Sequence, residues 1–262
     1  MGTERERKSP PSNDGHDGAR RGGTLETGDN LPFMRSLADA SIDFVYIDPP
    51  FNTGGRRRDA SGEYPDSWLT VDDYLEFMRP RLREMRRLLR PTGSLMLHCD
   101  WRSSHHLRLL LDDLFGADAF INHLIWSYGL GGSSPRRFAR KHDDILFYGR
   151  STAYFFDAPR VPATSARMRG QLKKATDVID IPTLNNMARE RTGYPTQKPL
   201  KLLDLLIRAA CPAGGVVADF FCGSGTTLVA AQRLDRGWIG CDISSDAIRI
   251  TRERLDHDAG AV

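Results

Sequence analysis

The chain has 262 residues, which is enough to bury a large core, and one α/β domain with insertions is the simplest interpretation. Its 37 basic and 34 acidic residues nearly balance, so the net charge by itself identifies no class of partner. The sequence shows no signal peptide and no apolar run long enough to span a membrane, and its four cysteines lack CxxC spacing. Together these features predict a cytoplasmic protein with buried free thiols, and the seven histidines show no spacing typical of a metal site.

In chain order, a tail of charged and small residues precedes alternating strands and helices. Residues 1–23 contain almost no apolar side chains, so they cannot offset the entropy of ordering and are predicted to be disordered. The hydrophobic periods then predict a helix at 33–37, a strand at 42–47, an arginine-bearing loop at 52–69, a helix at 71–89, a strand at 94–99, a helix at 103–114, and strands at 121–127 and 144–149. After a basic, loop-rich insertion at 151–190 come helices at 199–210, 225–234 and 245–256 and strands at 215–221 and 237–242. This alternation predicts a doubly wound, largely parallel sheet to which the insertion does not belong.

The most informative stretch is the turn after the strand at 42–47, where Asp48, Pro49, Pro50 and Phe51 follow one another. Proline fixes φ and has no N–H, so the two prolines make a stiff turn whose carbonyl groups project without ladder partners. The acid and these carbonyls form a rigid group of acceptors beside an aromatic face. Such a group suits a planar ligand with an exocyclic amine, for example a nucleobase.

A second turn, after the strand at 215–221, has the features of a cofactor site. Gly223 and Gly225 allow a ligand to approach the backbone closely, and the following helix offers free N–H groups to an anion. Asp242 ends the next strand about 20 residues later, the spacing at which an acid can hold ribose hydroxyls. The third glycine of a dinucleotide fingerprint is missing and no Gly-Lys-Ser/Thr marks a P-loop, so a nucleoside without pyrophosphate fits better than NAD.

Together the two turns resemble the paired motifs of amino-group DNA methyltransferases that use S-adenosylmethionine. The segments 48–54 and 221–227 carry the resemblance, and the catalytic tetrapeptide precedes the cofactor turn, as in the circularly permuted β group of that family. Further similar segments lie at 28–30, 120–126, 142–146 and 193–200. The resemblance implies a Rossmann-like α/β fold with a catalytic half at 24–150, a target-recognition insertion at 151–190 and a cofactor-binding half at 191–257.

The resemblance also implies roles for individual positions. Asp48 and the Pro49 carbonyl would accept hydrogen bonds from the target amine, Pro50 would complete the turn, and Phe51 would stack on the base. The tetrapeptide ends in Phe where Tyr is commoner in the family, and stacking survives without the hydroxyl. The residues implied for S-adenosylmethionine are Asp29 near its adenine, Asp242 at its ribose, Asp219, Phe221, Cys222, Gly223, Ser224, Gly225 and Thr226 at its methionine part, and Thr196 and Lys198 at its carboxylate end.

The implied reaction is methyl transfer to the N6 amine of an adenine flipped out of double-stranded DNA. The family's cytosine enzymes more often begin the tetrapeptide with Ser, so Asp48 favours adenine. N4-cytosine methylation is the alternative because it uses the same amine chemistry, and RNA is a less favoured substrate. Cytosine C5 methylation is disfavoured because it typically needs a Pro-Cys step, whereas this chain has Cys211 before Pro212.

Two other functional classes compete with this interpretation. A non-catalytic DNA-binding subunit would not need the intact turn from Asp48 to Phe51, which therefore argues against it. A nicotinamide oxidoreductase would bind NADH, and calorimetry against both cofactors would distinguish it.

The distribution of charge points to a nucleic-acid surface. Residues 133–174 contain ten basic and three acidic side chains, a local charge of +7 in a chain whose net charge is +3. This patch predicts contacts to phosphates by Arg136, Arg137 and Arg140, with 151–190 as the region that recognises the target. The family resemblance further implies a homodimer and a cognate restriction endonuclease as candidate partners.

Overall fold

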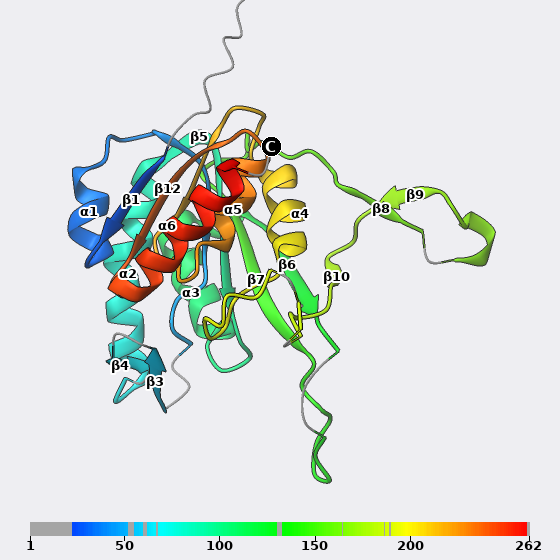
Figure 1. The fold of residues 1–262 in the computed structure, drawn as a ribbon, viewed down its shortest axis with the longest axis horizontal. Coiled ribbons are helices and arrows are strands. Elements are labelled where there is room, and N and C mark those ends of the chain that lie inside the picture. The colour runs from blue at the N-terminus through cyan, green and yellow to red at the C-terminus, as the bar shows by residue number, and fades with distance from the viewer. Residues whose placement is uncertain are drawn as a thin grey trace, which may run out of the picture.

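A single eight-stranded sheet forms the centre of the protein, in the order β1-β12-β11-β2-β5-β7-β6-β10 (Figure 1). The computed structural model describes residues 23–51, 55–59, 62–66, 68–129, 133–163, 165–185, 187–188 and 190–260. The strands of this sheet are β1 (Thr24–Thr27), β2 (Ile42–Ile47), β5 (Leu89–Cys99), β6 (Phe120–Ser127), β7 (His142–Gly149), β10 (Val178–Asp180), β11 (Val216–Asp219) and β12 (Gly237–Asp242). The tail predicted at 1–23, apart from its last residue, and the motif residues at 52–54 lie outside the described part of the chain.

Helices cover both faces of this sheet, which is the doubly wound arrangement predicted from the sequence (Figure 1). The helices are α1 (Asn30–Ser36), α2 (Val71–Leu88), α3 (Ser104–Phe115), α4 (Leu200–Ala210), α5 (Thr226–Arg233) and α6 (Ser245–Gly260). On one face α1, α2 and α3 pack against one another, and on the other α4 contacts α5, which contacts α6. Within the described residues, no helix combines the length and the apolar character that crossing a membrane requires.

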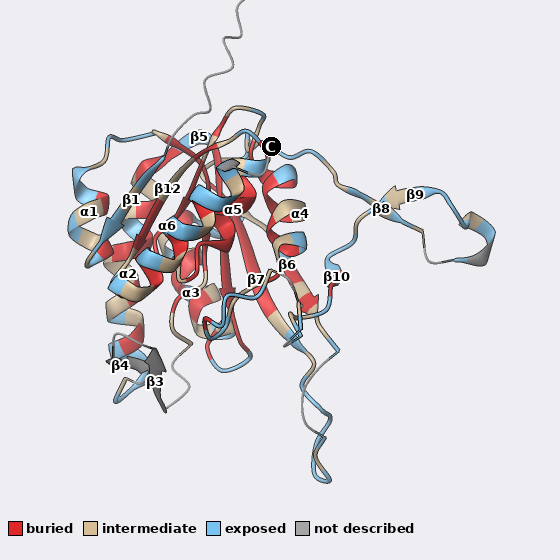
Figure 2. Ribbon diagram, in the orientation of Figure 1, coloured by how far each residue is buried: buried red, intermediate tan, exposed pale blue. Residues whose placement is uncertain are grey.

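The central strand β2 shows why the sheet is buried on both faces. All six of its residues are buried, and successive side chains of a strand point to opposite faces. Val45 and Ile47 pack in the core under α1–α3, whereas Phe44 and Tyr46 pack in the core under α4 and α5. Figure 2 shows the resulting burial, which is continuous through the central strands and absent from the projecting arms. The turn that follows β2 is therefore attached to a strand that is packed on both faces.

Three parts of the fold differ from the sequence prediction. The region predicted as a loop at 52–69 contains a hairpin of β3 (Gly55–Asp59) and β4 (Gly62–Asp66). β7 runs antiparallel to both of its neighbours, β5 and β6. β10 pairs with β6 at the edge of the main sheet, so the prediction that the insertion stays outside the sheet is wrong for this strand. A strand of three residues with one buried side chain is too short to give a detectable period.

Other parts of the insertion return to the body of the protein, since Ile181 is buried in the core and Thr183 and Leu184 line the main cavity, whereas its middle part projects. Its hairpin of β8 (Arg160–Pro162) and β9 (Leu172–Lys174) forms an arm at one side in Figure 1. The connection between β6 and β7 forms a second arm, which extends in a different direction (Figure 1). Both arms carry basic residues from the segment 133–174.

Candidate active site

The turns after β2 and β11 face one cavity because the two strands are neighbours in the sheet. They run parallel, with Val45 beside Ala218, so their carboxyl ends meet at the same edge. A cavity of about 740 Å³ lies there, a volume typical of small-molecule sites. Of the residues predicted for the two sites, those lining it are Asp29, Asp48, Pro49, Pro50, Phe51, Thr196, Lys198, Asp219, Phe221, Cys222, Gly223, Ser224, Thr226 and Asp242, but not Gly225.

The glycine turn that leads into α5 has a backbone that favours glycine. Gly223 and Gly225 have φ angles of 50° and 73°, in the left-handed region. A Cβ atom on Gly225 would lie 2.5 Å from Cγ2 of Thr251, closer than packed atoms can approach. The hydroxyl of Thr251 donates a hydrogen bond of 2.9 Å to the Gly223 carbonyl. Close packing on α6 thus holds the turn, and Gly225 lies beneath the cavity wall rather than in it.

Asp219, at the end of β11, closes the turn from one side. Its carboxylate accepts hydrogen bonds from the Phe221 N–H at 3.1 Å and from the Thr227 hydroxyl at 2.6 Å. Burial raises the pKa of Asp219 to about 7, even though these two hydrogen bonds lower it. A buried carboxyl with such a pKa is readily ionised by a nearby cation, which fits a positively charged ligand in the cavity.

Asp242, at the end of β12, closes the turn from the other side. One of its oxygens accepts the Gly223 N–H at 2.8 Å and the other accepts the Ser244 N–H at 3.0 Å. Arg254 on α6 adds a contact that the sequence did not indicate, because it donates to the Ser224 carbonyl at 2.5 Å. Burial lowers the pKa of Arg254 to about 10. No motif marks this arginine in the sequence.

Asp29 and Asn30 connect the first helix to the cofactor turn. Asp29 caps α1 and pairs with Arg81 of α2 at 2.8 Å. Arg81 also donates to the Asn30 side-chain oxygen at 2.8 Å, and the Asn30 amide donates to the Phe220 carbonyl at 2.7 Å. Arg81 is buried, and burial lowers its pKa, although Asp29 acts in the opposite direction. Asp29 was predicted from the sequence as a site residue. Arg81 was not, because it lies within the predicted helix at 71–89 and no motif marks it.

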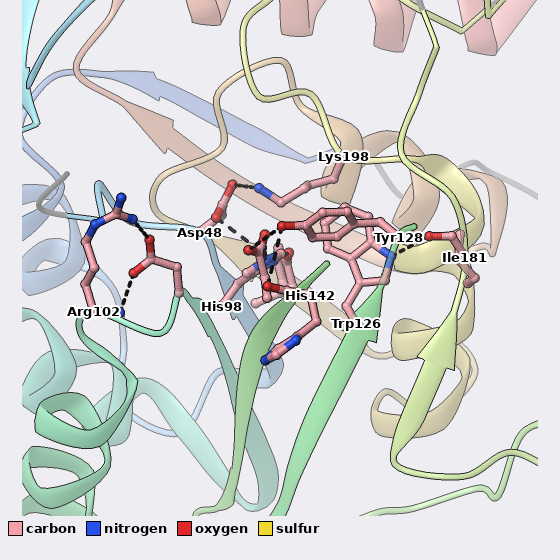
Figure 3. Close-up of polar contacts among 11 residues, drawn as sticks. Asp48, His98, Arg102, Trp126, Tyr128, His142, Ile181 and Lys198 are labelled. Carbon is pink, nitrogen blue, oxygen red and sulfur yellow. Dashed lines mark hydrogen bonds and ion pairs between the residues drawn. The ribbon is translucent and has the colours of Figure 1, made fainter. Parts of the chain in front are cut away.

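Lys198 lies beside the Asp48 turn and lines the same cavity as the cofactor turn. Its ammonium is paired with Oδ2 of Asp48 (Figure 3). It also lies 5.6 Å from the centre of the Phe51 ring. The family resemblance had placed it at the carboxylate end of the cofactor. Thr196, two residues earlier, lines the same cavity with a left-handed φ of 64°. The segment before α4 therefore reaches both turns.

A buried polar network lies behind Asp48, and sequence analysis did not find it. His98 of β5 is fully buried, with Nδ1 2.7 Å from the Tyr46 hydroxyl and Nε2 3.2 Å from Oδ2 of Asp143 (Figure 3). The Tyr128 hydroxyl donates to the other oxygen of Asp143 at 3.2 Å. Oδ1 of Asp48 is buried, has no hydrogen-bond partner and lies 4.0 Å from Nδ1 of His98. The one sequence signal was the segment 142–146, which includes Asp143 and supported the family resemblance without a role for this residue.

The three arginines predicted to contact phosphates lie away from the cavity. Arg136, Arg137 and Arg140 are exposed in the arm between β6 and β7 and do not line the cavity. The guanidinium of Arg140 lies 3.4 Å from the centre of the Trp101 ring, a cation–π contact. Within the described part of the chain, no cluster of His, Cys, Asp and Glu side chains is arranged to bind a metal ion.

Comparison with known sequences links the chain to one family. The model of a family described as DNA methylase matches residues 42–253. The chain is 30% identical over 230 residues to the Type II methyltransferase M.HpaI of Haemophilus parainfluenzae, covering 86% of this chain and 71% of that protein. It is 27% identical over 250 residues to the DNA adenine methyltransferase YhdJ of Escherichia coli (strain K12), covering 89% and 82%.

Comparison with solved structures shows the same fold. The PvuII DNA methyltransferase, described as cytosine-N4-specific, superposes with a TM-score of 0.70 at 18% identity, covering 90% of this chain and 88% of that one. TTHA0409 of Thermus thermophilus, described as a putative DNA modification methylase complexed with S-adenosyl-L-methionine, gives a TM-score of 0.62 at 23% identity, covering 92% and 96%. The shared architecture is a mostly parallel, mixed sheet between two layers of helices.

Proposed function

Since the chain belongs to the DNA methylase family, we propose that it transfers a methyl group from S-adenosylmethionine to the N6 amine of an adenine in double-stranded DNA. The family uses S-adenosylmethionine as its methyl donor, and the fold is the Rossmann-like methyltransferase fold. The observation that carries the proposal is the single cavity onto which both turns open, with the acceptors of Asp48 on one side and the glycine turn on the other.

The residues of the glycine turn suit this cofactor. S-adenosylmethionine carries a positive sulfonium and ammonium, and the Asp219 carboxyl in the cavity wall is one that a cation would ionise. Gly223 and Ser224 leave room for close approach of a ligand to the backbone, while Asp242 and Asp29 place carboxylates farther along the same cavity. We assign the methionine part to Asp219 and the Phe221–Thr226 turn, the ribose to Asp242 and the adenine to the side of Asp29.

The turn after β2 would act on the nucleophile. When bound, the cofactor supplies a methyl group on a positively charged sulfur. The Asp48 carboxylate and the Pro49 carbonyl accept hydrogen bonds from the exocyclic amine, which stabilises the positive charge that develops on its nitrogen. Phe51 offers a face for the base, and base–aromatic stacking of about 1–3 kcal/mol offsets part of the cost of flipping the base out of the duplex. The chain thus works by alignment rather than by a covalent intermediate.

The choice of adenine over cytosine depends on the first residue of the tetrapeptide. Asp48 is the acid that the family resemblance associates with adenine, and YhdJ, whose sequence resembles this chain over most of its length, is described as an adenine methyltransferase. N4-cytosine methylation is the second candidate, because the PvuII enzyme described as cytosine-N4-specific shares the fold. The same two acceptors would serve either amine.

DNA contacts are proposed for the arms rather than for the cavity. Arg136, Arg137 and Arg140 are exposed in the arm between β6 and β7, where the first two are available to meet the phosphates of a duplex and Arg140 also stacks on Trp101. The segment 151–190 is the proposed target-recognition region, since its arm also projects and is basic (Figure 1). A homodimer and a cognate restriction endonuclease are the partners that the family resemblance proposes.

Product analysis tests the proposal directly. The chain is expressed in a host without DNA methylation, beside an Asp48→Ala control. Hydrolysed DNA is then analysed by mass spectrometry for methylated nucleosides, and single-molecule sequencing locates them. We expect N6-methyladenine within one short sequence motif. N4-methylcytosine would replace the proposal with the second candidate, and the absence of both from cells that contain folded protein would contradict it.

A further inference from the structure

His98 is held in a way that fixes which nitrogen carries its proton. A carboxylate accepts hydrogen bonds and cannot donate them, so the contact to Asp143 at 3.2 Å requires a hydrogen on Nε2. In a neutral imidazole the other nitrogen then has a lone pair, which on Nδ1 accepts the Tyr46 hydroxyl at 2.7 Å. His98 is therefore a buried base whose acceptor nitrogen faces the side of Asp48.

Asp48 presents its two oxygens to different partners. Oδ2 is paired with the ammonium of Lys198. Oδ1 is buried without a hydrogen-bond partner, 4.0 Å from Nδ1 of His98. A buried acceptor without a partner is unfavourable, so this oxygen is placed to receive a donor that is present only during the reaction. Movement of either side chain by about 1 Å would bring Oδ1 and Nδ1 within hydrogen-bond distance.

Methyl transfer to an amine leaves an extra proton on the nitrogen, and a base must remove it. The nitrogen–carbon bond forms with the amine's lone pair, the sulfur–carbon bond breaks with its electrons moving to sulfur, and the nitrogen becomes a cation with one proton too many. The amine's N–H groups face the acceptors of the turn, so the nearest base is Asp48. An aspartic acid in this buried position would in turn need a second acceptor.

We propose that this proton passes from the amine to Asp48 and from Oδ1 of Asp48 to Nδ1 of His98, which makes His98 the final proton acceptor inside the protein. Asp143 then faces the imidazolium at Nε2 and stabilises its charge, and the Tyr46 hydroxyl rotates from donor to acceptor. The proposal rests on the proposed methyl transfer but applies equally to adenine and cytosine amines.

The surroundings of His98 are suited to a transient positive charge. The titratable groups that face it are Asp143 from β7, Asp48 and Tyr46 from β2, and, farther out, Lys198 and Tyr128. Burial would raise the pKa of Asp143, but hydrogen bonds from His98 and Tyr128 and the charges of His98 and Lys198 lower it, so Asp143 is ionised. Burial and Asp143 raise the pKa of Tyr128 to about 12, so this hydroxyl stays a donor. The charged groups around the imidazole are thus two carboxylates, of Asp48 and Asp143, and one ammonium, of Lys198.

The tautomer can be checked without catalysis. Histidine is labelled with ¹⁵N in the full chain, and the His98 signals are identified by their loss in His98→Asn. We expect a neutral imidazole with its hydrogen on Nε2 near pH 7. A hydrogen on Nδ1 would leave no lone pair toward Asp48 and would overturn the proposal.

The role in proton transfer is tested by single-turnover methylation across pH. The wild-type rate should fall at acid pH, because an already protonated His98 accepts no further proton. His98→Asn should lower the rate by roughly 100-fold or more and lose this acid limb, with cofactor binding unchanged by calorimetry. The matched control is His123→Asn, since His123 forms a similar pair with Asp144 at 2.8 Å on neighbouring strands but does not line the cavity.

A second variant keeps the test decisive if His98→Asn does not fold. Asp143→Asn retains a hydrogen-bond partner for Nε2 but removes the charge, so the acid limb should move to lower pH and the rate should fall. An acid limb unchanged in Asp143→Asn, or retained in a folded His98→Asn, would make His98 a structural residue only. If the wild-type chain methylates no DNA at all, the proposed function fails instead, which separates the two outcomes.

Discussion

The two turns at the sheet edge are built in different ways. The glycine turn is closed by partners within the same C-terminal part of the chain, since Asp219 accepts hydrogen bonds from Phe221 and Thr227, two and eight residues away, and Asp242 accepts one from Gly223, 19 residues away. The Asp48 turn is stiffened by two prolines but receives its polar partners from afar, because Lys198 is 150 residues away. Hydrogen bonds from nearby segments fix the surface of the glycine turn that would bind the cofactor. The position of the Asp48 carboxylate depends instead on Lys198, a partner from a distant part of the chain.

This difference implies that damage to the two turns has different consequences. Loss of a side chain at the Asp48 turn should remove chemistry and leave the fold and the cofactor surface intact. Loss of the glycine geometry should change stability and cofactor binding together, because the same backbone serves both.

Asp48→Ala should have the largest effect, and only on catalysis. It removes the acceptor for the target amine, so we expect methyl transfer to fall by roughly 100- to 1,000-fold, as when one stabilising group is lost from a preorganised site. Calorimetry should show S-adenosylmethionine binding within a few-fold of the wild-type chain. The matched control is Asp118→Ala, an exposed acid outside the cavity. Undiminished methylation by Asp48→Ala would contradict the mechanism.

Gly225→Ala should destabilise the glycine turn. Its φ of 73° costs a side chain about 1–2 kcal/mol, and overlap with Thr251 at 2.5 Å adds about 1–3 kcal/mol. Gly214→Ala is the matched control, because its φ is 69° but a Cβ there meets nothing within 4 Å. Chemical denaturation should therefore place Gly225→Ala below Gly214→Ala in free energy of unfolding, and cofactor affinity should fall only in the former. Equal losses would mean that contact with Thr251 contributes nothing.

The same contrast explains what the sequence could predict about the site. The glycine turn and its acids were identified because Gly223, Gly225 and Asp242 follow the ends of two successive strands, so spacing alone brings them together. The partners of Asp48 could not be found in this way. His98 faces Asp48 only because β5 pairs with β2 and β7 in one register, with Leu97 beside Ile47 and His98 beside Ile145. A shift by one residue would turn His98 to the other face.

The secondary structure shows a similar contrast between what could and what could not be predicted from the sequence. Long helices with strong periods were predicted within a few residues of their ends, as for α2 (Val71–Leu88) against 71–89, whereas the long strand β5 begins at Leu89 rather than at 94. Short strands were missed, namely β1, the β3–β4 and β8–β9 hairpins, and β10. The orientation of β7 was also beyond reach, because a buried apolar strand has the same pattern in either direction. A strand that is defined by its hydrogen-bonded partner, and not by a buried face of its own, can be identified only from the three-dimensional structure.

Asp219 should make cofactor binding depend on pH. Its pKa of about 7 lies above the ordinary value of 3.8, so the folded protein without cofactor holds a proton there, and this carboxyl's contribution to stability is lost as pH rises from about 4 to about 7. A cationic cofactor favours the ionised form and expels the proton. Affinity for S-adenosylmethionine should therefore tighten about tenfold from about pH 6 to about pH 8.

Calorimetry of Asp219→Asn checks this dependence. The variant retains the cofactor's own titration, so subtracting its pH profile from that of the wild-type chain isolates the carboxyl. The difference in affinity should narrow as pH falls below about 7 and level off at its largest value above about pH 8, and buffers with different ionisation heats should detect additional proton release in the wild-type chain. Identical profiles would mean that Asp219 does not face the cationic part of the cofactor.

The smallest effects should come from the arm between β6 and β7, which belongs to neither turn. Arg136→Ala and Arg137→Ala should each weaken duplex binding a few-fold and reduce the slope of log affinity against log salt concentration by roughly one. Arg140→Ala should change the slope less, since its guanidinium already stacks on Trp101 at 3.4 Å and is less free to meet a phosphate. Arg252→Ala, an exposed arginine on α6, is the matched control. An unchanged slope in all three variants would remove the arm from the DNA interface, whereas a loss confined to Arg136 and Arg137 would mean that these two arginines meet the phosphates while Arg140 serves mainly to pack the arm on Trp101.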